Sequence, residues 1–338
     1  MYPYTFILQM IVRNSNSFFR RENGRDRCFE TNYNEDKNSS LGGVLMNYEL
    51  TYQGYRAVID SHGGELISFR DPEGTEYIWD GNPAYWPGRN PLLFPIVGNL
   101  KDGTVKFEGV SYEMSRHGFA RDQEFTAVEQ GEDYIVLELQ ESDVTLTKYP
   151  YPFRLQVRQQ LIDKGFVTSF RVKNTGNRPM PFCIGAHTAF RCPIHEGEAF
   201  TDYEIVFDQV ETAPMRRLTD AGLVSHDQRE AFLHNQDRFA LNHEIFARVD
   251  TIIFDELKST GVALLHKGTG KGLRMDFEGF PMMAFWTKGA EQAPYICIEP
   301  WHGCAAVDNE TGEFAEKPHC MVLSPGEEKE LSYQVTTQ

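Results

Sequence analysis

The sequence predicts an all-β fold in the form of a β-sandwich, and three observations carry this prediction. Short segments rich in β-branched and aromatic residues recur along the chain, and several alternate apolar with polar side chains, as residues 135–139 and 154–158 do. The 28 glycines and 17 prolines provide many turn positions between such segments. Amphipathic helical patterns extend to about a dozen residues at most. Strands at this density without intervening helices are typical of a sandwich.

The predicted strands follow in order, each because a short run has strand composition or period-two alternation. Turn sequences separate them at residues 102–103, 174–177, 268–270 and 324–326. The glycine-rich stretch 268–272 lacks the full phosphate-loop pattern, so we expect a hairpin turn there. The expected strands are 48–59, 65–69, 104–107, 134–139, 154–161, 167–172, 203–207, 262–266, 273–277, 282–286, 295–298 and 330–335.

The first 45 residues differ in character from the rest. Residues 5–12 form a short apolar run without the flanking charges or cleavage site of a signal peptide, and residues 14–40 are polar without periodicity. Residues 1–45 carry a net charge of +1, which leaves −17 for the remainder. We expect residues 1–45 to be disordered or a non-native N-terminal extension. We expect residues 46–338 to form a single domain, because no linker or repeat divides them.

The acidic balance narrows the classes of partner. Lys and Arg number 33 against 49 Asp and Glu, and the net charge of −16 repels nucleic acid and anionic lipid. Apolar runs stay well short of the ~20 residues that cross a bilayer, so we expect no membrane partner. The six cysteines are scattered without a CxxC pair. A reduced, cytoplasmic setting with buried thiols therefore fits better than a disulfide framework.

Ionisable residues stand among glycine, proline and aromatic residues in four segments, whose central members are Arg89, His117, His187 and Glu299. Glycine permits close approach of a ligand, and aromatic faces suit the apolar C–H faces of a sugar. A single histidine or glutamate in such a setting is more often structural. Two histidines and a glutamate together supply an acid and a base whose pKa values are separated by environment.

The four segments together carry a specific motif set. They read Arg89 with Pro91-Leu92-Leu93-Phe94-Pro95, His117-Gly118-Phe119-Ala120-Arg121, Gly185-Ala186-His187 with Ala189-Phe190, and Glu299-Pro300-Trp301-His302-Gly303. In this order and spacing they resemble the aldose 1-epimerase (galactose mutarotase) family, specifically its LacX-like branch. The resemblance covers about residues 46–335. It implies a large β-supersandwich that interconverts the α and β anomers of a free sugar, without a cofactor or metal.

The resemblance also implies roles for individual residues. Glu299 falls on the family's catalytic base, which takes the proton from the C1 hydroxyl, and His187 falls on the acid that protonates the ring oxygen. His117 matches the second active-site histidine. Three further residues match positions that bind sugar oxygens or a C6 substituent: Arg89, Arg121 and, on a short motif, Asp250. An ionised carboxylate and a histidine with a pKa near neutrality suit these roles.

Two positions depart from the family pattern. Thr188 stands where the family usually has proline after the histidine, which frees the backbone and restores an N–H donor without removing the imidazole. His302 stands where a bulky aromatic residue is common in this branch. We interpret His302 as a residue that lines the sugar pocket, or alternatively lies at its rim.

Three alternatives stay open from the sequence. A non-catalytic carbohydrate-binding or sensing domain would not need both Glu299 and His187. A hexose-6-phosphate 1-epimerase would use Arg89 and Arg121 to hold the phosphate. A metal hydrolase would use His187, Cys192 and His195, but their spacing matches no common zinc pattern.

Overall fold

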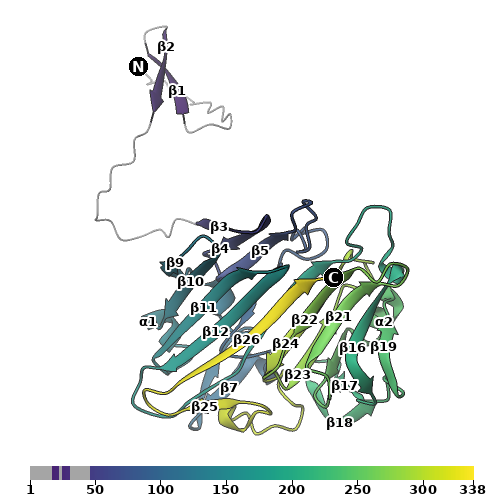
Figure 1. The fold of residues 1–338 in the computed structure, drawn as a ribbon. Coiled ribbons are helices and arrows are strands. Elements are labelled where there is room, and N and C mark those ends of the chain that lie inside the picture. Colours follow the sequence, from purple (N-terminus) through teal and green to yellow (C-terminus); the bar gives the residue numbers. More distant parts are fainter. Residues whose placement is uncertain (1–16, 23–24, 31–45) are drawn as a thin grey trace, which may run out of the picture. The chain divides into compact units, whose positions relative to one another are not determined.

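The structure is a computed structural model that describes residues 17–22, 25–30 and 46–338. The chain divides into two compact units, Met1–Gly43 and Val44–Gln338. In the first unit, β1 (Ser17–Glu22) and β2 (Arg25–Glu30) pair as an antiparallel hairpin (Figure 1). Most of residues 1–45 lie outside the described residues, so the expectation of a disordered or non-native extension stays a prediction.

Strands arranged in antiparallel sheets build the second unit, which confirms the predicted all-β fold. The nine strands of the larger sheet are β9 (Thr126–Gln130), β10 (Tyr134–Gln140), β11 (Phe153–Ile162), β12 (Gly165–Asn174), β16 (Tyr203–Glu211), β19 (Gln236–Ala240), β21 (Gly261–His266), β22 (Gly272–Asp276) and β26 (Glu328–Thr337). They are ordered β19-β16-β21-β22-β26-β12-β11-β10-β9.

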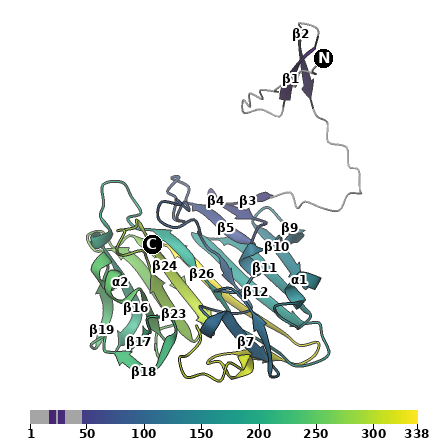
Figure 2. The same ribbon diagram turned by 180° about the vertical axis from the view of Figure 1, so that it is seen from behind.

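A second large sheet carries the candidate site residues. Its strands are β6 (Leu92–Leu93), β14 (Ile184–Ala186), β15 (Thr188–Arg191), β17 (Met215–Leu218), β18 (Val224–Glu230), β20 (Thr251–Phe254), β23 (Met282–Trp286) and β24 (Tyr295–His302). Their order is β18-β17-β20-β23-β24-β14-β6, and β15 also pairs with β24. Figures 1 and 2, which view the unit from opposite sides, show the two large sheets face to face.

Smaller elements complete the unit. The remaining strands are β3 (Asn47–Tyr52), β4 (Tyr55–Asp60), β5 (Glu65–Arg70), β7 (Thr104–Phe107), β8 (Val110–Glu113), β13 (Met180–Phe182) and β25 (Met321–Leu323). The helical elements are α1 (Asp143–Leu146), α2 (His243–Val249) and 3-10 turns at Lys101–Gly103, Ala120–Asp122, Phe200–Asp202 and Phe314–Glu316. Across the described residues, the helices are all too short or too polar to span a membrane.

Each predicted strand lies close to an observed one, with one correction. The prediction did not include the observed strands β6, β8, β9, β13, β14, β15, β17, β18, β19, β20 and β25. The predicted strand 48–59 is a hairpin, β3 and β4, because Gln53 and Gly54 both adopt positive φ, 48° and 87°. Two consecutive residues with positive φ make the tight turn that fits the twist of a two-residue hairpin. The glycine-rich stretch 268–272 forms the predicted turn between β21 and β22.

Burial differs between the two sheets in a way that matters for the site. Along β11 buried and partly exposed residues alternate, as expected for a sheet with one face on the core and one toward solvent. Along β24, by contrast, seven successive residues from Tyr295 to Trp301 are buried. A carboxylate on β24 is therefore removed from water whichever face it points to.

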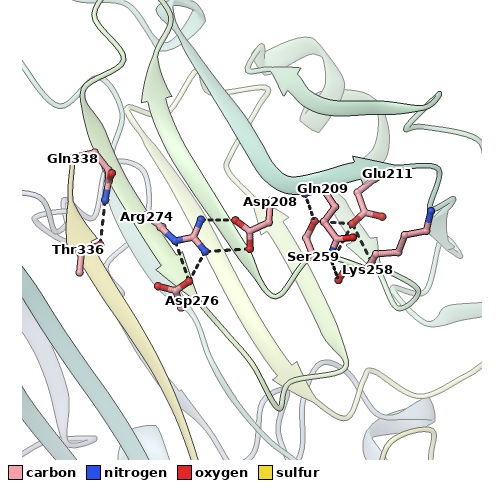
Figure 3. Close-up of polar contacts among 9 residues, drawn as sticks. All are labelled: Asp208, Gln209, Glu211, Lys258, Ser259, Arg274, Asp276, Thr336 and Gln338. Atoms are coloured by element: carbon pink, nitrogen blue, oxygen red, sulfur yellow. Dashed lines mark hydrogen bonds and ion pairs between the residues drawn. The ribbon is translucent and has the colours of Figure 1, made fainter.

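Hydrogen bonds and ion pairs between polar side chains link strands of the larger sheet, among them β16 and β22 (Figure 3). Arg274 on β22 donates to Asp208 on β16 and to Asp276, with Nη2–Oδ2 at 3.1 Å and Nε–Oδ1 at 2.9 Å respectively. Glu211 at the end of β16 is fully buried, and its Oε1 accepts from the Ser259 backbone N–H at 2.8 Å and hydroxyl at 2.7 Å. These contacts have a structural role.

Candidate active site

His187 and Glu299 face each other across two paired strands. The register pairs Gly185 with Trp301 and Thr188 with Ile298, which sets His187, between β14 and β15, directly opposite Glu299 on β24. His187 Nε2 lies 3.3 Å from Glu299 Oε2, and the side chains are only 8% and 1% exposed. The sheet ladder itself thus brings together two residues 112 positions apart in the sequence.

Gly185 makes this close pairing possible. A Cβ added there would lie 2.7 Å from Trp301 Cδ1 and 3.0 Å from the Pro300 carbonyl oxygen. Two residues before His187, the chain therefore has no space for a side chain, and glycine lets β14 lie flat against β24.

His117 comes from a loop that is locked by reciprocal bonds with Gly98. The Gly98 N–H donates to His117 Nδ1 at 3.1 Å, and the His117 N–H donates to the Gly98 carbonyl at 3.0 Å. The next residue, Gly118, has φ +76°, and a Cβ there would lie 2.1 Å from the Phe94 carbonyl oxygen. The imidazole of His117 is held edge-on to that of His187, with ring centroids 5.6 Å apart.

The tautomer of His117 follows from the bond to Gly98. A neutral imidazole accepts at one nitrogen only, so an Nδ1 that accepts from Gly98 leaves the proton on Nε2. Arg116 Nε–H is also directed as a donor at His117 Nε2, at 3.1 Å. A neutral imidazole cannot accept from both donors, because each contact requires a different nitrogen to be without a proton. The bond from Gly98 is the buried one of the two, so we assign the proton to Nε2. His117 then offers Nε2–H as a donor.

Burial favours the neutral forms of all three groups. It raises the pKa of Glu299 well above its usual value. Burial and then the charge of Arg116 lower the pKa of His187 to about 3, and burial also lowers the pKa of His117 well below its usual value. The sequence argument expected an ionised carboxylate beside a near-neutral histidine. In the structure the pair instead favours a single proton, held by Glu299.

Arg121 and Asp250, two predicted sugar-binding residues, lie near the pair. Arg121 adds positive charge that lowers the pKa of His117 and His187, and its Nη2 donates to the Arg116 carbonyl at 3.0 Å. Asp250 acts on Glu299 through its negative charge, which raises the pKa of Glu299. Its backbone, at φ 62° and ψ −71°, is strained for a non-glycine residue, a feature that clusters at functional sites.

Arg89 and His302 make their contacts elsewhere. Arg89 Nη1 donates to the Ile67 carbonyl at 3.2 Å, and its backbone N–H donates to the buried Glu65. His302 Nδ1 donates to the His319 carbonyl at 2.7 Å. Because side chains alternate along β24, His302 lies on the face opposite to Glu299. The structure therefore does not bring these two predicted residues into contact with the pair.

Sequence reasoning missed Arg116 and an aromatic wall. The Trp86 ring lies 4.8 Å from the His187 ring at 33°, and the Trp286 ring lies 5.5 Å away at 77°. Tyr295 packs against both tryptophans. The sequence signal that could have identified Arg116 was its position directly before His117, a predicted site residue. Tryptophan among proline and glycine, as at Trp86, was another.

One group of possible metal ligands exists among the described residues. His187, Cys297 and Glu299 each offer a ligand atom, all within 4.8 Å of one another. Cys192 and His195, on which the hydrolase alternative depends, are not part of this group. Two of these three residues, His187 and Glu299, are the ones that face each other across the strands.

The comparison with known proteins decides the family. Residues 46–336 match the sequence profile described as aldose 1-epimerase. The chain belongs to the aldose 1-epimerase family. It is also 35% identical over 298 residues to Protein LacX, chromosomal, of Lactococcus lactis subsp. lactis, covering 86% of this chain and 99% of LacX. Within this family member, the profile match covers all of the second unit except its first two and last two residues.

Solved structures agree with the family. A galactose mutarotase related enzyme from Lactobacillus acidophilus superposes with a TM-score of 0.82 at 27% identity, covering 87% of this chain and 97% of that one. A galactose mutarotase-like protein from Lactobacillus casei gives 0.80 at 24% identity, with 87% and 100% covered, and shows the fold alone. The galactose mutarotase-like supersandwich expected for an aldose 1-epimerase is thereby confirmed.

Thr188, the residue after His187, has a side chain that points away from the pair. Its hydroxyl donates to Asn90 Oδ1 at 2.7 Å and lies 3.1 Å from the Tyr333 hydroxyl. Tyr333 also donates to Asn90 Oδ1, at 3.3 Å. All three residues are buried. The residue after His187 thus joins its strand to β26 of the facing sheet.

Proposed function

We propose that the protein is an aldose 1-epimerase that interconverts the α and β anomers of a hexose by opening and reclosing the sugar ring. The direct opposition of His187 and Glu299, 3.3 Å apart, carries the proposal. The C1 hydroxyl oxygen and the ring oxygen are bonded to the same carbon, so an acid and a base this close can serve both. The reaction changes no oxidation state and requires no redox cofactor.

Proton transfer proceeds in two mirrored steps. Glu299 takes the proton of the C1 hydroxyl as base, while His187 gives a proton to the ring oxygen as acid. The bond between C1 and the ring oxygen breaks, and C1 becomes the aldehyde carbon. Rotation about the C1–C2 bond presents its other face. The reverse transfers then reclose the ring, and the pair regains its starting state.

Electrostatics of the pair favour ring opening. The opening step converts a carboxylate and an imidazolium into a carboxylic acid and a neutral imidazole. Burial favours the second state, because it raises the pKa of Glu299 and lowers that of His187. The charge of Arg116 lowers the pKa of both groups, so it favours the carboxylate of Glu299 and disfavours the imidazolium of His187.

Surrounding residues position the sugar. His117 donates from Nε2 to the ring oxygen or a neighbouring hydroxyl, and Arg121 and Asp250 bind further sugar oxygens. The Trp86 and Trp286 rings offer apolar surface to the C–H groups of the sugar. Negative charge that develops on oxygen is stabilised by Arg116.

Anomer exchange of a freshly dissolved α-hexose, followed by polarimetry, tests the proposal. Glu299→Gln and His187→Gln should each lower kcat about 10²–10⁴-fold, the usual contribution of general acid–base groups. Glu211→Gln is the matched control, because Glu211 is also a buried carboxylate but lies on the other sheet. Wild type that relaxes the sugar no faster than buffer would instead support a non-catalytic carbohydrate-binding domain.

A hexose 6-phosphate is the second candidate substrate. The observation that favours it is the pair of cations beside the site, Arg116 and Arg121, whose charges reach His117 and His187. Arginine binds phosphate with good geometry, although the net charge of −16 repels it at long range. Comparing kcat/KM for glucose and glucose 6-phosphate, in wild type and Arg121→Gln, separates the two.

A further inference from the structure

Cys183 and Cys320 lie opposite each other just beyond a two-stranded ladder. β13 and β25 pair Met180 with Leu323 and Phe182 with Met321, so the same register sets Cys183 opposite Cys320. Directly opposed residues of an antiparallel pair have Cα atoms about 4.5–5.5 Å apart. Disulfides form across about 4.4–6.8 Å, so a pair that continues this register has the spacing that a disulfide needs.

The backbone bonds of the two cysteines bring their side chains together. The Cys183 N–H donates to the Pro95 carbonyl and the Cys320 N–H to the Lys317 carbonyl, so the two residues do not bond to each other through these groups. In such pairs the side chains approach most closely. Hydrogen bonding to the Cys320 side chain is the largest influence that raises the pKa of Cys183, and burial is the second. Cys320 Sγ lies 3.6 Å from the carbonyl oxygen of Phe182, the residue directly before Cys183, and both thiols are free.

Accessibility and charge separate the roles of the two thiols. Cys320 is partly exposed, whereas Cys183 is fully buried. Hydrogen bonding to Cys320 and burial hold the pKa of Cys183 well above its usual value, and the charge of the buried Lys317, three residues before Cys320, lowers it only in part. An oxidant from solvent thus meets Cys320 first, and Cys183 stands behind it as a resolving thiol.

We propose that Cys183 and Cys320 form an oxidative modification site that reacts with hydroperoxides and closes to a disulfide. The Cys320 thiolate attacks the terminal oxygen of the peroxide, the O–O bond breaks, and Cys320 becomes a sulfenic acid while water or an alcohol leaves. The Cys183 sulfur then displaces the sulfenic oxygen as a second water. Two thiols are oxidised by two electrons, and the peroxide is reduced.

The bridge would join the active-site strand to a long connection. Cys183 immediately precedes β14, and His187 follows four residues later. Cys320 ends the segment that links β24 to β25, and the His319 carbonyl already accepts from His302. The disulfide would tie both ends of this connection to the sheet that carries the acid–base pair. The inference does not depend on which sugar the protein uses.

The test is peroxide treatment of the full-length folded protein. Hydrogen peroxide is added stepwise, remaining thiols are blocked with an alkylating agent, and a non-reducing digest is mapped by mass spectrometry. Wild type should lose two thiols together and yield a peptide pair joined through Cys183 and Cys320. The melting temperature of the oxidised protein should rise by several degrees, because the bridge closes a long loop, and dithiothreitol should reverse the shift.

Matched variants distinguish the neighbouring thiols. Cys304 is a neighbouring buried thiol whose pKa Cys183 helps to raise, so Cys304→Ser is the control that should still form the bridge, whereas Cys320→Ser should not. If Cys320→Ser fails to fold, the wild-type peptide map alone still decides. A bridge between Cys183 and Cys304, a bridge to Cys28, or Cys320 oxidised to sulfinic acid without any bridge would each overturn the proposal. Survival of both free thiols after peroxide in the folded protein would do the same.

Discussion

Replacing Thr188 by valine tests how the strand of His187 is held. Valine has nearly the same shape as threonine but lacks the hydroxyl that donates to Asn90 Oδ1 at 2.7 Å. Losing one buried hydrogen bond while Asn90 keeps its bond from Tyr333 should cost about 1 kcal/mol of the free energy of unfolding. Tyr333→Phe should cost about the same, because Thr188 then remains as the donor.

The double variant carries the sharper expectation. With both hydroxyls removed, Asn90 Oδ1 is a buried acceptor without a donor in this cluster, at a cost of about 1–3 kcal/mol. The double variant should therefore lose more stability than the sum of the single losses, with a coupling of about 1 kcal/mol. Equilibrium unfolding in urea measures all four proteins. Strict additivity would show that the three residues do not share one bond network.

Activity in Thr188→Val provides an independent check. Because Thr188 and His187 point to opposite faces of the strand, kcat should stay within about twofold of wild type. A loss as large as that of His187→Gln would refute the orientation derived from the strand register.

Three further results are expected. First, kcat/KM should stay level from pH 7 to well below pH 6.5. Burial lowers the pKa of His187 to about 3, so the pair of His187 and Glu299, which already holds one proton, takes up a second one only in that acidic range; a fall by half near pH 6.5 would contradict this. Second, Trp86→Ala should raise KM more than it lowers kcat, since Trp86 packs on His187 without carrying a proton, and sugar binding should quench less tryptophan fluorescence in this variant than in wild type. Third, Gly118→Ala should lower the free energy of unfolding by more than about 2 kcal/mol, because its Cβ would lie 2.1 Å from a carbonyl oxygen; urea unfolding like that of wild type would show that the loop yields freely.

Sequence reasoning succeeded where local pattern decides structure. Strands such as β11 and β12 alternate strongly, and the structure extends the predicted segments by only a few residues at their ends. It failed for β14 and β15, which contain three and four residues, because His187 interrupts the ladder between them. Runs so short carry no usable periodicity.

The site shows the same division between local and distant information. Resemblance named His187, Glu299 and His117, and the structure brings these three together. The bonds of Thr188 could not be predicted, because Asn90 and Tyr333 are 98 and 145 residues away in sequence. His302 was predicted to line the site or its rim because it lies close to Glu299 in the sequence. Alternation along β24 places Trp301 on the same face as Glu299 and His302 on the opposite face.

His187 and Glu299 are held by adjacent strands of a sheet, whereas Trp86, Arg116 and Asp250 come from loops. The spacing between neighbouring strands is about 4.8 Å, so the backbone positions that carry His187 and Glu299 stay at a fixed separation whatever the size of the substrate. The loops that contain Trp86, Arg116 and Asp250 are free of that restriction. Chemistry and selectivity are thus separable in this scaffold. A library that diversifies those three loops and leaves the ladder intact should change which sugars are accepted while it preserves the reaction.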